Sequence, residues 1–571
     1  MPILTGAEIL VKCMVREGIR YVFGVPGGEL TPLLEAIRVE DGIEFILTRH
    51  EQAAAHMADA YFRLTNDMAA CIGTVGPGAA DLVPGVYPAY ADGIPLMVVT
   101  AQHQSWKSYP SHGSMQELDQ YMLFKAVTKW NAVVNDVSRI PELFHRAVRN
   151  AYRGRMGPVH LDLPVDILFK KYQFDDIDEF IPDRSRYRAL TKPVGELDAI
   201  KRAAKLLVEA DKPVIHPGGG ALWSGAYEEI KLLAEYLSMP VIPSMIAKGI
   251  LPEDHPLYFI PGTMVSLEIQ SQADLVLLIG CRVGDLDFWG RPPAWGEPDK
   301  QKIIQIDIDP ENIALNRYVD LAILGDAKLT LKLLIDEVKR LTDPIKRDYS
   351  TYKEMEREWQ EGFINVAMQD WGGIHPLRAI HEVRKFFPRD AIVVMDGGNV
   401  PVWAHYLNRI YGPRTFLWAG DSGHLGTGLP YAIAAKLAKP ERDVYLLTGD
   451  GSLMFNIQEM ETAVRLGTKI HVIVLNDRAY GMIRGVQKLL YKGKYYGVDF
   501  HDVDYAKIAS GMGWYGRRVV EPEEIHSALE EAYSQERPAL IDVVTPKEIS
   551  MEPPDLALLG ELWMEGVEFP K

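Results

Sequence analysis

The sequence predicts an α/β protein made of three doubly wound parallel-sheet domains and a C-terminal tail. Short apolar, β-branched segments alternate with longer segments of helical period along the whole chain. The 571 residues exceed the roughly 250–300 residues at which a single core stops growing. Two polar stretches, residues 170–195 and 340–372, divide this pattern into three parts.

Four segments in each domain have the apolar, β-branched character of a buried strand. In chain order these are residues 19–24, 70–75, 95–100 and 158–163, then 213–216, 240–243, 274–279 and 303–308, then 391–395, 443–448, 470–475 and 539–544. The first and third domains share this layout, and the charged connection at 340–372 is typical of a helix. We therefore expect domains at residues 1–170, 190–340 and 372–548. The tail at 549–571 contains an apolar segment, 556–563, that is a candidate lid.

Composition and charge exclude several functional classes. Apolar residues make up 47% of the chain and charged residues 24%, as in soluble globular proteins, and the net charge of −17 argues against nucleic acid or an anionic membrane as partner. No segment has the length of a membrane span or the pattern of a signal peptide. Cys13, Cys71 and Cys281 lie far apart without metal-ligand spacing, which favours reduced thiols. We expect a cytoplasmic protein with a small-molecule substrate.

Two polar motifs follow consecutive predicted strands of the third domain. Residues 449–452 (Gly-Asp-Gly-Ser) follow one strand, and residues 476–477 (Asn-Asp) follow the next. Parallel strands bring their carboxyl ends to one edge of the sheet, so Asp450 and Asp477 should lie side by side. Gly451 lets the backbone approach an anion, and carboxylates together with a backbone carbonyl suit Mg²⁺. Either motif alone is an ordinary turn, whereas the pair is far more specific.

The run from residue 449 to 477 resembles the thiamine diphosphate binding motif. Over nearly its whole length the chain resembles the acetolactate synthase-like family, which includes the acetolactate synthase large subunit, 2-hydroxyacyl-CoA lyase and oxalyl-CoA decarboxylase. The family motif usually ends in two asparagines, where this chain has an aspartate at 477. The resemblance implies Mg²⁺ held by Asp450, Asp477 and the carbonyl of Ala479. It implies cofactor contacts from Glu51, Gly398, Asn399, Gly423, Leu425, Gly449, Asp450, Gly451, Ser452, Asp477, Gly481 and Met482.

Three residues of the first domain are candidate catalytic residues. Taken alone, Glu51 is a first-turn carboxylate of a helix. In the family, a glutamate in this setting is buried against the cofactor's pyrimidine ring, shares a proton with a ring nitrogen and so promotes loss of the thiazolium C2 proton. Gln116 resembles a family glutamine at the substrate end of the cofactor. His112 lies nearby in sequence and is either a proton relay or a surface histidine.

The central domain has glycine turns after its predicted strands, at residues 217–220 and 280–283. Nucleotides bind at such loops, but every doubly wound sheet needs similar turns. Members of the family use this domain for FAD, for ADP or coenzyme A, or for no ligand. Only part of the FAD pattern is present, so all three possibilities stay open.

The resemblance implies decarboxylation and carboligation of a 2-oxo acid such as pyruvate. Two features favour an alternative, a 2-hydroxyacyl-CoA lyase or oxalyl-CoA decarboxylase that releases formyl-CoA: the Gly398-Asn399 pair, and Val486 where anabolic acetolactate synthases have tryptophan. A third alternative is an inactive nucleotide-binding homologue, although Glu51 and both metal-binding aspartates are present. The resemblance also implies an active site between the first domain of one subunit and the third domain of another, hence a homodimer or homotetramer.

Overall fold

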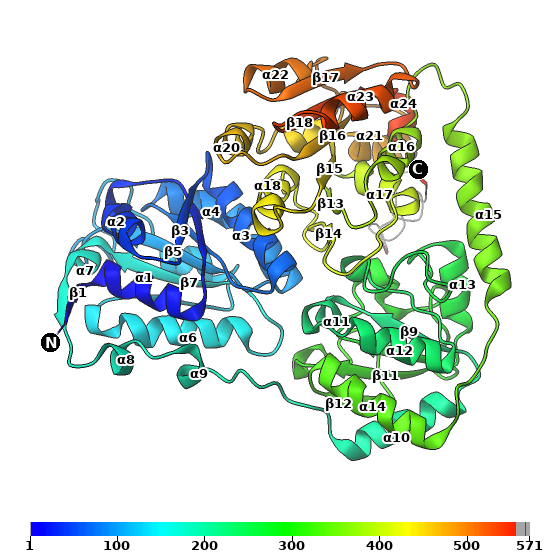
Figure 1. Cartoon of the computed structure of the whole chain (residues 1–571), viewed down its shortest axis with the longest axis horizontal. Coiled ribbons are helices and arrows are strands. Elements are labelled where there is room, and N and C mark those ends of the chain that lie inside the picture. Colours follow the sequence, from blue (N-terminus) through cyan, green and yellow to red (C-terminus); the bar gives the residue numbers. More distant parts are fainter. Residues whose placement is uncertain (1, 555–565, 567–571) are drawn as a thin grey trace.

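The computed structural model describes residues 2–554 and Gly566. Three domains, each with its own parallel sheet, form three lobes (Figure 1): the N-terminal domain at the left, the central domain at the lower right and the C-terminal domain at the upper right. The fold class is as predicted. The candidate lid at 556–563 lies outside the described residues.

The N-terminal domain is a six-stranded sheet in the order β3-β2-β4-β5-β7-β6, and every neighbouring pair is parallel. Its strands are β2 (Tyr21–Gly24), β3 (Glu44–Leu47), β4 (Ala70–Gly73), β5 (Met97–Gln102), β6 (Trp130–Val133) and β7 (Val159–Pro164). Its helices are α1 (Gly6–Glu17), α2 (Thr31–Val39), α3 (Glu51–Thr65), α4 (Pro77–Asp92), α5 (Gln120–Lys125), α6 (Ile140–Tyr152) and α7 (Val165–Phe169). A short antiparallel pair, β1 (Ile3–Thr5) with β8 (Lys171–Gln173), joins the two ends of the domain.

The central domain has four parallel strands in the order β12-β11-β10-β9. They are β9 (Pro213–Pro217), β10 (Leu275–Ile279), β11 (Lys302–Asp307) and β12 (Leu321–Leu324), and the main helices are α10 (Leu197–Glu209), α12 (Tyr227–Leu237), α13 (Met264–Gln272) and α14 (Ala327–Leu341). The strand predicted at 240–243 is wrong, because Val241 makes only isolated bridges to Ile215 and Tyr258. Prolines at 240 and 243 have no N–H to donate, which prevents a regular ladder.

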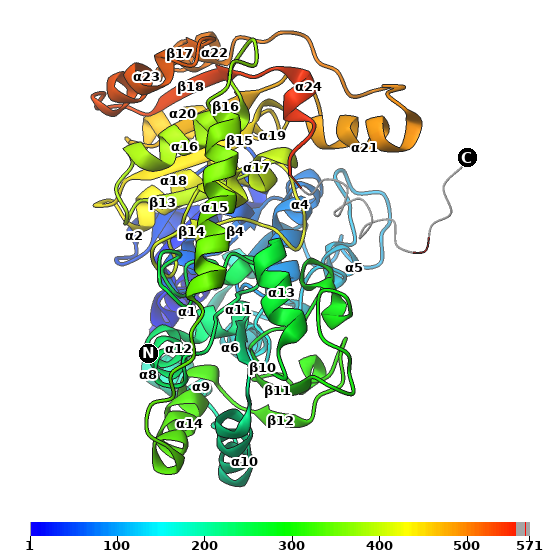
Figure 2. The same cartoon turned by 90° about the vertical axis from the view of Figure 1, so that its right-hand side faces the viewer.

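The C-terminal domain repeats the strand order of the first domain, as the shared layout predicted: β14-β13-β15-β16-β18-β17. Its strands are β13 (Ile392–Met395), β14 (Phe416–Leu417), β15 (Val444–Gly449), β16 (His471–Asn476), β17 (Tyr515–Val519) and β18 (Ala539–Val544). Its helices are α16 (Pro376–Phe386), α17 (Asn399–Leu407), α18 (Gly428–Ala438), α19 (Asp450–Leu453), α20 (Glu459–Arg465), α21 (Gly481–Tyr491), α22 (Tyr505–Gly511), α23 (Glu524–Tyr533) and α24 (Lys547–Ser550). The expected helical connection is α15 (Ser350–Ala367), which runs from the central lobe to the upper one, and α21 projects from the side of the molecule (Figure 2).

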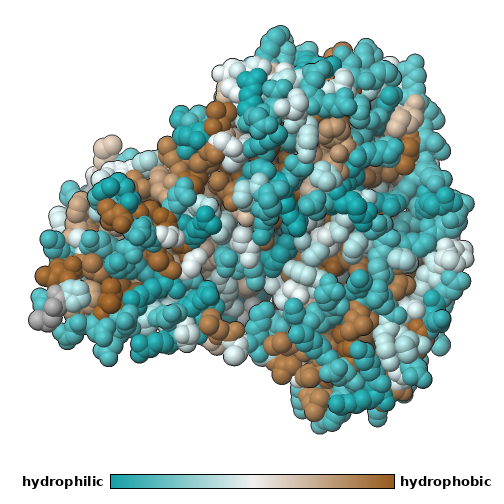
Figure 3. Space-filling view, viewed as in Figure 1, coloured by the Kyte–Doolittle hydropathy of each residue, from teal (hydrophilic) through white to brown (hydrophobic). Residues whose placement is uncertain are grey.

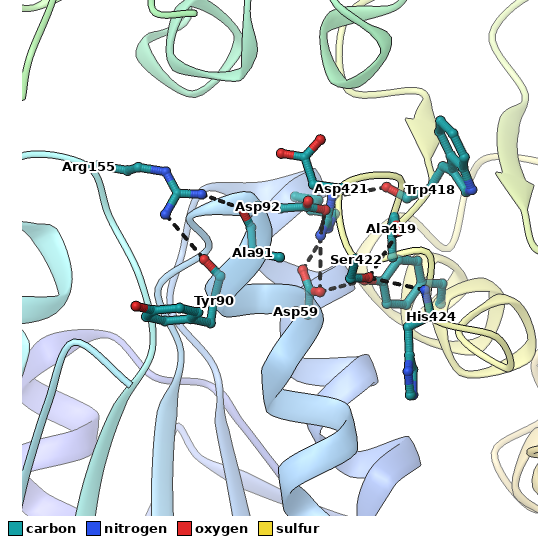
Figure 4. Close-up of polar contacts among 12 residues, drawn as sticks. Asp59, Tyr90, Ala91, Asp92, Arg155, Trp418, Ala419, Asp421, Ser422 and His424 are labelled. Carbon is teal, nitrogen blue, oxygen red and sulfur yellow. Dashed lines mark hydrogen bonds and ion pairs between the residues drawn. The ribbon is translucent and has the colours of Figure 1, made fainter. Parts of the chain in front are cut away.

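The first and third domains of the chain pack together through α3 and α18, and one apolar core runs across the junction. Buried Arg63 forms ion pairs with Asp59 and Asp92, each at 2.6 Å, and donates to the carbonyl of Trp418 across the junction at 3.2 Å. The polar contacts of this region are drawn in Figure 4. Because each of these three charged side chains has a partner of opposite charge, they can be buried at the junction.

The surface in Figure 3 is mostly hydrophilic, with apolar groups scattered over it, and it is notched between the N-terminal and central lobes. Within the part of the chain that the structure describes, no helix combines the length and the apolar character needed to cross a membrane.

Candidate active site

Two aspartates lie side by side at the carboxyl edge of the C-terminal sheet. Strands β15 and β16 pair with Gly449 opposite Leu475, so Asp450, directly after β15, and Asp477, directly after β16, reach the same edge. Both are buried, at 2% and 7% exposure. Burial and then the neighbouring Asp477 raise the pKa of Asp450 to about 8, and burial raises the pKa of Asp477 to about 6. Two buried carboxylates in contact resist being ionised together, and a divalent cation between them would remove that penalty.

The backbone after Asp477 holds its carboxylate in place. The amide of Ala479 donates to Asp477 Oδ1 at 3.1 Å, and the amide of Tyr480 donates to the carbonyl of Val498 at 2.8 Å. A Cβ atom on Gly481 would lie 2.4 Å from Asp477 Oδ2. A side chain at this first position of α21 would therefore displace the Asp477 carboxylate.

A cavity of about 590 Å³ opens above this pair. Its wall contains every residue for which the resemblance implies metal or cofactor contact in the C-terminal domain: Gly398, Asn399, Gly423, Leu425, Gly449, Asp450, Gly451, Ser452, Asp477, Ala479, Gly481 and Met482. The volume lies in the range of small-molecule sites, roughly 300–1,000 Å³. Among the described residues, those that line this cavity all come from position 245 onward, and none belongs to the N-terminal domain.

Two residues that shape this cavity were given no role from the sequence. Buried Asp396, at the end of β13, accepts from the amides of Gly426 and Gly428, each at 3.0 Å, and so holds the glycine-rich loop against the sheet. Burial raises the pKa of Asp396 to about 6. The carbonyl of Ser550 accepts from Asn399 Nδ2 at 2.8 Å. The position of Asp396, between a buried strand and two glycines, is the signal that could have identified it.

The Gly-Asp-Gly-Ser motif at residues 449–452 leads directly into a short helix. Helix α19 begins at Asp450, and Gly449 is the capping residue in extended conformation. Ser452 therefore lies inside this short helix, buried within the cavity wall.

Glu51 is the first residue of α3 and is buried, at 9% exposure. Desolvation raises the pKa of its carboxyl. The neighbouring Gln52 contacts His424 of the glycine-rich loop, with 3.1 Å between Gln52 Nε2 and His424 Nε2. The start of α3 thus abuts the C-terminal domain of its own chain, but Glu51 is not among the residues that line the 590 Å³ cavity.

The structure does not bring Gln116 or His112 to this cavity. Both lie in the exposed loop between β5 and α5, with Gln116 at a φ of 63°. The ring of His112 is 3.8 Å from the Glu117 carboxylate. The carbonyl of Gln116 packs against Gly76, where a Cβ would come within 2.3 Å of it. The Gln116 backbone therefore helps to hold the start of α4.

A larger cavity, of about 1,340 Å³, lies where the central domain meets the other two. The glycine turns predicted from the sequence line it, together with arginines of the N-terminal domain. Arg155 donates to the carbonyls of Tyr90 and Ala91, and Arg282 pairs with Asp421 at 2.7 Å. Figure 4 shows Arg155 extending toward Tyr90 and Ala91, and Asp421 on the neighbouring loop.

Comparison with known proteins accounts for all three domains. Family models for the thiamine pyrophosphate enzyme match residues 4–123 (N-terminal TPP binding domain), 200–334 (central domain) and 396–543 (C-terminal TPP binding domain). The chain is 36% identical to a probable acetolactate synthase large subunit of Methanococcus aeolicus, over 97% of this chain and 94% of that protein. It is 31% identical to the acetolactate synthase isozyme 3 large subunit of Escherichia coli K12, over 100% of both chains.

Proposed function

The chain belongs to the thiamine pyrophosphate enzymes of the acetolactate synthase-like family, and we propose that it decarboxylates a 2-oxo acid such as pyruvate and joins the remaining fragment to a second carbonyl. The observation that carries this proposal is the buried Asp450–Asp477 pair, which lies in a cavity lined by the predicted cofactor contacts. The similarity to acetolactate synthase large subunits favours carboligation over release of formyl-CoA.

The residues around the cavity fit thiamine diphosphate and Mg²⁺. Asp450, Asp477 and the carbonyl of Ala479 would hold the metal ion, with diphosphate oxygens and water completing its coordination. The bare backbone of Gly398, Gly449 and Gly451 lets phosphate groups approach closely. When bound, thiamine diphosphate supplies the carbon nucleophile and the electron sink for decarboxylation.

We assign to Glu51 the task of holding a proton at its carboxyl group. Its burial raises the pKa, which favours the protonated form of the carboxyl. Burial also excludes water that would otherwise exchange with that proton. Gln116 and His112 remain candidates for contact with the substrate. Their exposed loop would have to close over the site to bring them to it.

We propose that Glu51 serves the cavity of a second subunit in a homodimer or homotetramer. The support is the resemblance, together with the absence of N-terminal residues from the described wall of the cavity in a single chain.

Burial of all three unpaired cysteines is consistent with a reducing compartment, and we propose the cytoplasm.

We propose that the 1,340 Å³ cavity binds a nucleotide, either FAD or an ADP-containing molecule such as coenzyme A. The glycine turns at the ends of β9 and β10 and the arginines of the opposite wall support an anionic, phosphate-bearing ligand. Chromatography of small molecules released from the denatured protein would identify it. A flavin or an adenine nucleotide at one per chain is expected, and protein free of both would contradict this assignment.

The test of the main proposal is incubation with pyruvate, thiamine diphosphate and Mg²⁺, followed by measurement of CO₂ and acetolactate. Formation of both products, lost in Glu51→Gln, is the expected result. If pyruvate gives no product while thiamine diphosphate still binds, the proposed substrate class is wrong. Cleavage of a 2-hydroxyacyl-CoA to formyl-CoA would then be measured. Activity in either assay also excludes an inactive homologue.

A further inference from the structure

Three side chains from separate parts of the central domain meet beside the large cavity. His216 lies in β9, Cys281 follows β10, and Asp287 lies in the segment Asp285–Gly290. Each offers one ligand atom, and these atoms all lie within 4.8 Å of one another. No sequence spacing reveals this cluster, because Cys281 is an isolated cysteine in the chain and only the fold brings the other two residues to it.

Two distances within this cluster match those between the ligands of a tetrahedral metal ion. His216 Nε2 is 3.3 Å from a carboxylate oxygen of Asp287, and Cys281 Sγ is 3.5 Å from the other. Zinc ligands at roughly 2.0–2.3 Å from the metal stand about 3.3–3.6 Å from one another in tetrahedral geometry. A metal ion could therefore enter with only small side-chain movements.

His216 lacks the hydrogen bonds that a buried imidazole normally makes. It is 2% exposed, and neither of its ring nitrogens has a hydrogen-bond partner among the described residues. Its ring packs edge-on against Trp295 at 5.2 Å between centroids, and Trp295 Nε1 donates to the Asp287 carbonyl at 2.8 Å. The tryptophan therefore orients both the histidine and the aspartate segment, as partners beyond the ligands do in metal sites.

We propose that His216, Cys281 and Asp287 bind one Zn²⁺ or a similar divalent transition-metal ion. The nitrogen, sulfur and oxygen donors suit zinc, whereas the oxygen-only set at Asp450 and Asp477 suits Mg²⁺. Cys281 and Asp287 line the large cavity, which leaves a fourth coordination position for water or a cavity ligand. The ion would tie the Asp285–Gly290 segment to the ends of β9 and β10. Asp287 lines both cavities, so coordination of the ion by Asp287 would stabilise the wall between them.

Cobalt substitution tests the site directly in the full-length protein. The chelator-treated protein is saturated with thiamine diphosphate and Mg²⁺ to occupy the oxygen site, and Co²⁺ is then titrated. We expect a thiolate-to-Co²⁺ charge-transfer band in the near ultraviolet that saturates at one Co²⁺ per chain. The chain has only three cysteines, so the band can be assigned by substitution. Cys281→Ser should abolish it, and the control Cys71→Ser, at another buried cysteine in β4, should keep it.

His216→Gln provides an independent variant, expected to weaken Co²⁺ and Zn²⁺ binding by at least about tenfold. Absence of the band in the unsubstituted protein would overturn the proposal, whether or not the variants fold. A band that persists in Cys281→Ser would overturn it as well. Because acetolactate formation is measured separately, failure of the zinc site would leave the proposed activity untouched.

Discussion

The cavity around Asp450 and the start of α3 at Glu51 are built in different ways, although the family resemblance marks both. The cavity collects loops that follow neighbouring strands of one sheet, so its residues converge within a single chain. Glu51 is buried at a domain junction and is absent from that cavity wall. Residues that follow neighbouring strands, such as Asp450, are therefore brought together by the topology of one sheet. The role of Glu51, at the start of a helix, depends instead on which surface packs against that helix.

The largest effect is expected at Glu51. Glu51→Gln removes the carboxyl proton transfer and should lower acetolactate formation by about 10²–10⁴-fold, with thiamine diphosphate affinity close to that of the parent. Steady-state kinetics and calorimetric titration would measure the two quantities. Glu142→Gln, an exposed first-turn glutamate of α6, is the matched control and should retain activity. Equal activity of Glu51→Gln and the parent would remove Glu51 from the mechanism.

The next largest effect is expected at the aspartate pair. Asp450→Ala removes one proposed metal ligand and should weaken Mg²⁺-dependent binding of thiamine diphosphate by about 10–100-fold. Calorimetric titration with thiamine diphosphate, with and without Mg²⁺, measures this loss of affinity. Asp443→Ala, directly before the opposite end of strand β15, should leave binding unchanged. Unchanged Mg²⁺ dependence in Asp450→Ala would show that the cavity holds the cofactor by other means.

The smallest effect is expected at the position where this chain departs from the family motif. Asp477→Asn restores the usual asparagine, keeps an oxygen ligand and relieves the repulsion with Asp450. Binding of thiamine diphosphate should therefore change by only a few-fold, in contrast to Asp450→Ala. A loss as large as that of Asp450→Ala would mean that the negative charge at 477 is itself required.

The strands that the sequence did not reveal are all edge strands. Segments β3, β6, β12, β14 and β17 each lie at the border of a sheet, and β1 and β8 pair only with each other. An edge strand can expose one face and so lacks a continuous apolar run: β12 alternates buried and exposed residues, and β17 carries Arg517 and Arg518. The interior strands were recognisable because both of their faces are buried.

The site residues that could be predicted from the sequence also depend on interior strands. Asp450 and Asp477 were predictable because each follows an interior strand, and adjacent strands fix their proximity. Ser550 was not predictable, since its contact with Asn399 spans 151 residues and depends on how the end of the domain folds back. Gln116 rested on the resemblance and His112 on its nearness to Gln116 in sequence, and their exposed loop does not reach the cavity in this conformation.

Mixing two impaired variants tests the two-chain active site most directly. Chains carrying Glu51→Gln and chains carrying Asp450→Ala are combined under conditions that exchange subunits, and acetolactate formation is measured at a thiamine diphosphate concentration that saturates the parent but not Asp450→Ala. If each site uses Glu51 of one chain and Asp450 of another, a mixed dimer contains one intact site. Random pairing should then restore about a quarter of the parent activity. A mixture as inactive as either variant alone would contradict the account, because it would mean that both residues serve a site within one chain.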